Sequence, residues 1–153
     1  MNTRKQWISP DDLFCALEEQ LAENRQALFT VTGMSMWPFL HHGRDQVVLA
    51  AVKPEDIRTG DIVLLRARQG RYLLHRVTKK TPMGIETTGD SNCFRDGLFP
   101  YGCVIGRTVT LIRAGKTIDC GAWQWKLVFR CWMLLFPLRK QLIALWKQIR
   151  GIK

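Results

Sequence analysis

The sequence predicts a mainly β fold, arranged as a small barrel or sandwich with one helix before it and a helical tail after it. Short runs rich in Val, Ile, Leu and Thr recur along the middle of the chain, as in an all-β domain made of hairpins. Glycines and prolines separate the runs and favour turns between them. The β domain is therefore predicted over residues 28–118, with strands at 28–32, 46–51, 61–66, 72–77, 84–88 and 104–112.

Residues 1–27 form the first predicted segment, an amphipathic helix that runs over residues 10–27. Ser9 is its expected N-cap and Pro10 its first helical residue, because serine accepts free backbone N–H groups and proline fits the first turn. Asn24 falls on the apolar face and weakens the last turn. That face is expected to pack on the β domain and carries Leu13, Leu17 and Leu21.

Residues 119–153 form the last predicted segment, a basic, Trp-rich helical tail interrupted at Pro137. Of the net charge of +10, residues 113–153 carry +8, from nine Lys/Arg and one Asp. The longest uncharged run, residues 131–138, is too short to span a membrane. Tryptophans and cations on an amphipathic helix are typical of the lipid interface, so residues 123–150 are expected to bind an anionic membrane surface. A helical pair that covers the domain or forms a dimer contact is the alternative, and nucleic acid is not an expected partner.

Cysteine and histidine usage predicts no metal site and no cofactor, because no C-x-x-C pair and no histidine cluster occurs. The cysteines are expected to be reduced, as in the cytosol, with a Cys93–Cys103 bridge as the chief exception. No apolar run follows Arg4 and Lys5, so neither a secretory signal nor a preceding membrane anchor is expected. These features predict a cytoplasmic protein that is peripheral on the inner membrane face. The five cysteines are Cys15, Cys93, Cys103, Cys120 and Cys131.

One serine lies in a setting suited to nucleophilic chemistry. Ser35 sits between Gly33 and Pro38, in a stretch that can form a tight exposed turn. A serine hydroxyl becomes a good nucleophile only when a neighbouring base takes its proton. The residues expected to contact a substrate around Ser35 are Gly33, Met34, Met36 and Pro38.

His75 is the candidate base, because a strand holds its imidazole rigidly. A single histidine in a strand is more often structural, so the hypothesis needs a third group. Asp90 and Asp96, in a glycine-containing loop after a predicted strand, could orient the ring through its other nitrogen. Two loop aspartates that cap local amides are the ordinary alternative. A lysine base, Lys79 or Lys80, is a poorer fit because it would need burial to lower its pKa.

Four short boxes in order resemble the type I signal peptidase family, whose superfamily includes the SOS-response repressor autoproteases. The resemblance covers about half of the chain, residues 28–106, and the His-Arg-Val box is similar to that of the endoplasmic-reticulum and archaeal branch. The boxes are Ser35-Met36-x-Pro38-x-Leu40, Gly60-Asp61-Ile62-Val63, His75-Arg76-Val77, and Gly89-Asp90-Ser91-Asn92 followed by Asp96.

The resemblance implies a signal-peptidase-like β fold and a serine endopeptidase that cleaves a precursor peptide through an acyl-enzyme. It implies Ser35 as nucleophile and His75 as base, with Asp96 the first choice for orienting His75 and Asp90 the second. Gly33 stands where some relatives place a serine that helps to bind the oxyanion. Because no N-terminal anchor is expected, a leader on a cytosolic precursor is a better candidate substrate than a translocated preprotein. A non-catalytic module that binds and delivers a peptide at the membrane is the alternative function.

Overall fold

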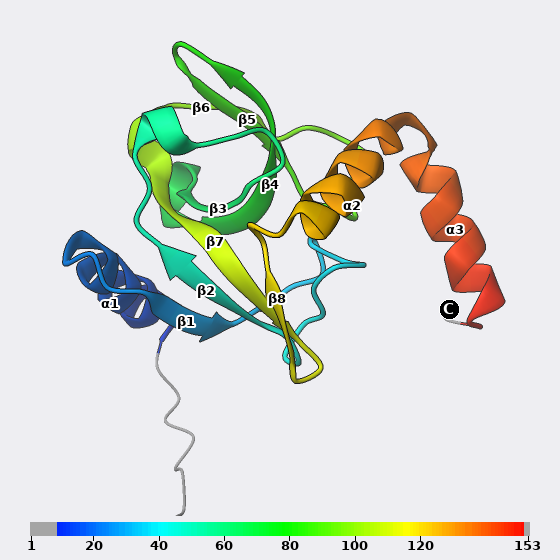
Figure 1. The fold of residues 1–153 in the computed structure, drawn as a ribbon, viewed down its shortest axis with the longest axis horizontal. Coiled ribbons are helices and arrows are strands. Elements are labelled where there is room, and N and C mark those ends of the chain that lie inside the picture. The colour runs from blue at the N-terminus through cyan, green and yellow to red at the C-terminus, as the bar shows by residue number, and fades with distance from the viewer. Residues whose placement is uncertain (1–8, 152–153) are drawn as a thin grey trace, which may run out of the picture.

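The computed structural model describes residues 9–151 and contains eight antiparallel strands joined in one sheet, with one helix before the sheet and two after it (Figure 1). Residues 1–8 of the predicted segment 1–27, and residues 152–153 of the predicted tail 119–153, lie outside the described residues. The helices are α1 (Pro10–Ala22), α2 (Trp123–Leu134) and α3 (Arg139–Ile149). The strands are β1 (Ala27–Thr30), β2 (Gln46–Ala50), β3 (Ile62–Arg66), β4 (Tyr72–Thr81), β5 (Gly84–Thr88), β6 (Gly97–Phe99), β7 (Val104–Arg113) and β8 (Lys116–Asp119).

The sheet is open, with the strand order β1-β2-β7-β3-β4-β5-β6. The mainly β prediction is confirmed, but the predicted barrel or sandwich is wrong. A barrel would need β1 to pair with β6, whereas each is an edge of the sheet and β6 has only three residues. A sandwich would need a second sheet, whereas β8 joins the same sheet by pairing with the second half of β7.

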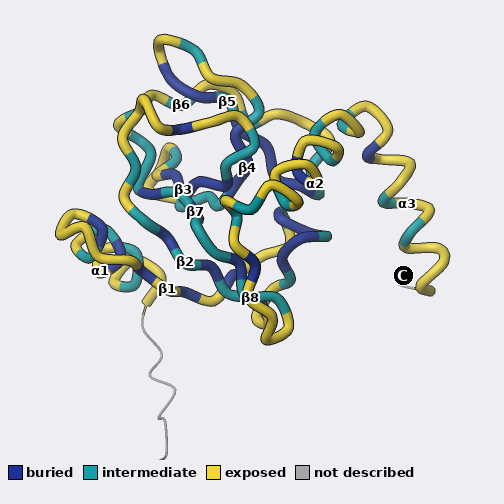
Figure 2. The backbone as a smooth tube through the Cα atoms, in the orientation of Figure 1, coloured by how far each residue is buried: buried dark blue, intermediate teal, exposed yellow. Residues whose placement is uncertain are grey.

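Two clusters of buried side chains lie on the two faces of the sheet. The strand β3 takes part in both, because neighbouring residues point to opposite faces: Leu64 belongs to the first cluster, and Val63 and Leu65 to the second. Both helix α1 and helix α2 contribute to the first cluster, through Leu17 and Leu21 and through Phe129. In Figure 2 the dark blue segments follow the strands, while most of α3 is exposed.

Helix α1 begins where the sequence predicts and ends earlier. The Ser9 side chain accepts a hydrogen bond from the Asp12 N–H, and Pro10 opens the helix, so the predicted start is confirmed. The helix ends at Ala22 rather than at residue 27. Asn24 has a left-handed φ of +56°, which turns the chain into β1 before another helical turn can form.

The tail is helical and broken at the predicted place. A short 3₁₀ turn, Phe136–Leu138, contains Pro137 and separates α2 from α3. Over residues 9–151 no helix has the length and apolar character needed to cross a membrane. Apolar side chains that are more than a third exposed occur on both helices and in the connection between them: Trp123, Leu127, Val128, Leu134, Leu135, Leu138, Leu142, Leu145 and Ile149.

Candidate active site

The structure brings His75 and Asp96 together. The ring nitrogen Nδ1 of His75 lies 2.5 Å from the Asp96 carboxylate, and the two side chains are only 6% and 9% exposed. Thr87 fixes the carboxylate, because its hydroxyl donates to the same oxygen at 2.8 Å and its carbonyl accepts the Asp96 N–H at 2.9 Å. The Nε2 atom of His75 is then the ring nitrogen left to exchange a proton.

Asp90 has a different partner. Both of its carboxylate oxygens accept hydrogen bonds from Arg76, at 2.8 and 2.7 Å, and neither side chain is exposed to solvent. Arg76 also donates to the Gly60 carbonyl at 2.8 Å. Since His75 and Arg76 are neighbours in β4, their side chains point to opposite faces, and each takes its own aspartate. Of the two aspartates, Asp96 is therefore the one that contacts His75.

Ser35 lies in the long connection between β1 and β2 and packs against the loop that follows β5. The Ser35 carbonyl accepts hydrogen bonds from Ser91, at 2.9 Å from the N–H and 3.2 Å from the hydroxyl. Residue 89 must be a glycine, because a Cβ atom at this position would lie 2.6 Å from the carbonyl oxygen of Ser35 and 3.0 Å from the Cβ of Ser35. The Ser35 segment therefore packs at the end of β5, whose last residue, Thr88, pairs with Arg76, the neighbour of His75 in β4.

The structure shows no direct route for a proton from the Ser35 hydroxyl to the His75 ring. Among residues 9–151, no hydrogen bond joins the Ser35 hydroxyl to His75. The Ser35 N–H also has no acceptor within this part of the chain, so it is available to bind an oxyanion. Catalytic hydrogen bonds often tighten only when a substrate binds, and a working pair needs about 3 Å between the serine oxygen and the base.

Two of the four expected substrate contacts face solvent. Gly33 is exposed, and its left-handed φ of +83° and its hydrogen bond to the His42 ring at 2.9 Å shape the turn. Met34 is 54% exposed beside Ser35. Met36 is only 1% exposed and packs in the first core cluster, so its side chain supports the fold rather than a substrate. Pro38 is half-buried, and its carbonyl accepts a hydrogen bond from Arg113 at 3.3 Å.

The two lysines considered as bases have other environments. The Lys80 ammonium donates to the carbonyls of Pro54, Glu55 and Ile57, at 2.8, 3.0 and 3.1 Å, and so fixes the turn before β3. Lys79 is exposed to solvent, whereas the His75 side chain is buried against Asp96. His75 is therefore the better placed base.

Arg139 is a residue that the sequence did not single out. It belongs to α3 but is completely buried, and it donates to the carbonyls of Gly89 and Asn92 at 3.2 and 3.4 Å. It thus supports from behind the same loop that packs on Ser35. The only signal in the sequence is its position directly after the Pro137 interruption, where the chain turns back toward the domain.

Asp45 anchors the base of the segment that carries Ser35. Its carboxylate accepts hydrogen bonds from Arg44, from the His41 N–H at 2.8 Å and from the Ala114 N–H at 3.1 Å. Burial raises the pKa of Asp45, but these hydrogen bonds outweigh it and hold the pKa at about 2. The contact with Ala114 ties the Ser35 segment to the turn between β7 and β8.

Replacing Asp45 by Asn is expected to lower the free energy of unfolding at pH 7 by about 2 kcal/mol. Because the folded pKa is depressed, this stability is present above the usual pKa of 3.8 and is lost as the pH falls toward about 2. Urea unfolding at pH 7 and near pH 2 measures both effects. Asp11→Asn, an exposed position on α1, is the control. A difference between wild type and D45N that stays constant over this pH range would contradict the assignment.

Neither a cluster of metal-ligating side chains nor a disulfide occurs within residues 9–151. No group of three or more His, Cys, Asp or Glu side chains in the described part of the chain could hold a metal ion. All five cysteines are free thiols, and burial raises the pKa of Cys120 to about 12.

Comparison of the chain with protein-family models, with curated proteins and with solved structures finds no match. Support for a function therefore comes from the residues of the site and their geometry.

Proposed function

We propose that this protein is a serine endopeptidase that removes a leader or signal segment from a precursor peptide through an acyl-enzyme. The observation that carries the proposal is the buried hydrogen bond between His75 Nδ1 and Asp96, formed beside the loop on which Ser35 packs. An aspartate that accepts from one ring nitrogen fixes the tautomer and leaves the other nitrogen to act as a base.

Each member of the site has one role in this reaction. The Ser35 hydroxyl attacks the scissile carbonyl while His75 Nε2 takes its proton, and the same nitrogen then gives the proton to the leaving amine. Asp96 stabilises the imidazolium that forms between these steps. The free N–H of Ser35 stabilises the negative charge on the oxygen of the tetrahedral intermediate. Water then hydrolyses the acyl-enzyme.

The tail supports a place of action at the cytoplasmic face of a membrane. Its excess of Lys and Arg matches the cytoplasmic side, and its exposed apolar side chains suit the lipid interface. Five free thiols agree with a reducing compartment. A leader on a precursor made in the cytosol is the corresponding substrate class.

A non-catalytic module that binds and delivers a peptide is the second candidate. The observation that favours it is the missing hydrogen bond between Ser35 and His75. Such a module would keep the exposed surface at Gly33 and Met34 for a peptide backbone without needing a proton path.

A library of proteome-derived peptides tests the two candidates, with new amino termini detected by mass spectrometry. The endopeptidase is expected to generate termini at a defined sequence preference, and Ser35→Ala is expected to abolish all of them while binding the same peptides. Trapping of an acyl group on Ser35 at low pH would identify the intermediate. Peptide binding without cleavage by the wild-type protein would favour the binding module instead.

A further inference from the structure

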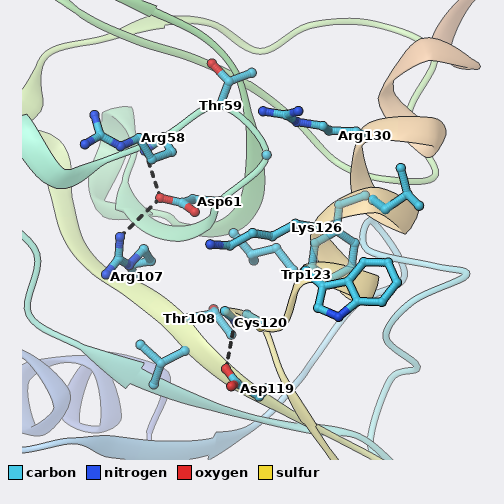
Figure 3. Close-up of a pocket in the computed structure, with 16 residues that line it drawn as sticks. Arg58, Thr59, Asp61, Arg107, Thr108, Asp119, Cys120, Trp123, Lys126 and Arg130 are labelled. Carbon is cyan, nitrogen blue, oxygen red and sulfur yellow. Dashed lines mark hydrogen bonds and ion pairs between the residues drawn. The ribbon is translucent and has the colours of Figure 1, made fainter.

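Two adjoining cavities lie between α2 and the sheet, and Ser35 is not among the residues that line them. The larger, about 660 Å³, is bordered by the segment before β3, by β7 and by α2 (Figure 3). The smaller, about 400 Å³, lies under the second half of α2 and the 3₁₀ turn that follows it. They share Thr59 and Arg130 in their walls, so we treat them as one cationic groove.

The groove has a large excess of positive charge. Its two carboxylates, Asp61 and Asp119, are both engaged: Asp61 accepts from the Arg58 N–H at 2.8 Å, and Asp119 accepts from the Gly121 N–H at 2.7 Å. The lining of the groove contains six cationic side chains and only these two acidic ones, and both acids belong to the larger cavity. The cations are Arg58, Arg95, Arg107, Lys126, Arg130 and Arg139.

Lys126 and Arg130 are the cations available to a ligand. They are one helical turn apart on α2, and both point from the helix into the larger cavity, where Arg130 approaches Thr59 (Figure 3). Within residues 9–151, neither side chain forms an ion pair or a hydrogen bond. Two neighbouring cations without a carboxylate repel one another, and an anion between them relieves the repulsion.

Arg139 adds a buried positive charge to the smaller cavity. It is completely buried and its Nε has no hydrogen-bond partner. Its hydrogen bonds go to carbonyl oxygens rather than carboxylates, and its guanidinium lies 5.0 Å from the ring centroids of Trp132 and Phe136. Burial lowers the pKa of Arg139, as expected for a guanidinium that has lost its water. A buried cation with an unused N–H donor is costly unless an anion compensates it.

Apolar side chains border the groove on the solvent side. Trp123, Leu127 and Leu134 belong to the lining of the cavities and are 72%, 54% and 80% exposed. A free inorganic anion or an acidic peptide would bind the cations without burying the apolar side chains at this rim. A ligand that combines a phosphate with hydrocarbon chains matches both the cations inside and the leucines outside.

We propose that the cationic groove binds the phosphate headgroup of an anionic phospholipid and thereby fixes α2 at the membrane surface. In this proposal the phosphate binds at Arg130, which lines both cavities, with Lys126 in the wall of the larger cavity and Arg139 in the wall of the smaller one. Such a site differs from diffuse attraction to a basic surface. The inference rests on the proposed membrane partner and not on the proposed cleavage reaction.

The test compares two charge-matched double variants of the full chain, each in a Ser35→Ala background so that cleavage cannot affect the result. Lys126→Gln/Arg130→Gln removes two cations from the groove, and Lys140→Gln/Lys147→Gln removes two exposed cations from α3. Binding is measured by flotation with vesicles of phosphatidylglycerol, with phosphatidylcholine vesicles as the neutral probe. The groove variant is expected to lose at least about tenfold more affinity for phosphatidylglycerol than the α3 variant.

Three outcomes would overturn the proposal. Equal losses in the two variants would show diffuse attraction to the whole tail, which each cation strengthens alike. Displacement of the protein from vesicles by millimolar inorganic phosphate would show a free-phosphate site. Tighter binding to single-stranded DNA than to vesicles at matched salt would assign the groove to nucleic acid. Leu134→Gln further separates a phospholipid from free phosphate as the ligand. This variant should weaken binding to vesicles and leave binding of inorganic phosphate unchanged.

Discussion

Replacing His75 by alanine is expected to lower the cleavage rate on the order of a million-fold, with the fold intact. The reason is that neither lysine can replace His75 as the base: Lys80 is bound to three carbonyls, and Lys79 is exposed. Residual activity would come from the oxyanion site and substrate binding alone. The measurement is the rate of release of a new amino terminus from a peptide identified in the library.

Asp96→Asn tests the same site and is expected to lower the cleavage rate less than His75→Ala does. An amide can accept from the imidazole only with a changed hydrogen-bond network, because Thr87 already donates to the same oxygen at 2.8 Å. The wrong tautomer is then favoured, and the rate is expected to fall by about 10⁴-fold with little change in KM. This split between kcat and KM marks a group that acts on the base rather than on substrate binding.

His41→Ala is the matched control, because this second histidine lies in the same region and its side chain makes no hydrogen bond within the described residues. Its cleavage rate should equal that of the wild type. A His75→Ala protein that cuts as fast as wild type would remove His75 from the mechanism, and a D96N protein at full rate would reduce the His75–Asp96 contact to a structural one.

The sequence predicted best those strands whose own residues favour extended backbone. The runs at β2, β3, β5 and β7 are rich in β-branched and apolar residues, and the structure places strands there within a residue or two. The strands β6 and β8 were missed because Gly97–Phe99 and Lys116–Asp119 are too short for a periodic pattern. Each forms only because a longer neighbour, β5 or β7, supplies a free edge.

The partners of the strands could not be predicted, and this is why the predicted barrel or sandwich was wrong. Strand β7 comes late in the chain but lies between β2 and β3, and it divides its second edge between β3 and β8. Such long-range order depends on packing of both faces and leaves no local pattern in the sequence.

At the candidate site, spacing alone left Asp90 and Asp96 as alternatives. What separates them is the alternation of β4, which sends Arg76 to one face with Asp90 and His75 to the other with Asp96. Arg139 was beyond prediction, because a charged residue in a basic helix is expected to be exposed. Its burial depends on the turn at Pro137, which folds the start of α3 against the loop at Gly89.

Replacing Asp90 by alanine is expected to lower the free energy of unfolding by about 3–5 kcal/mol, as for other broken buried ion pairs, and this is the largest stability loss that we predict. The variant leaves the Arg76 guanidinium completely buried without a carboxylate. The rings of Phe129 and Phe39 lie 4.1 and 5.2 Å from it, and they compensate only part of a full charge. Urea unfolding at pH 7 measures the loss, with the exposed Asp56→Ala as the matched control.

The double variant Arg76→Met/Asp90→Leu shows whether the loss comes from the uncompensated charge. If it does, removing both charges should recover most of the stability, because the site is already lined by aromatic rings. A double variant as unstable as D90A would mean that the loop after β5 depends on the geometry of the ion pair, through Arg76 and its bond to Gly60.

The same variant also separates stability from chemistry. Well below its unfolding midpoint, D90A still has the contact between His75 and Asp96, since that pair lies on the other face of β4. Its cleavage rate should therefore fall far less than that of D96N, although D96N is the more stable protein. If the two variants lost activity in proportion to their stability, the aspartates would share one structural role, and the division of labour between the two faces of β4 would be wrong.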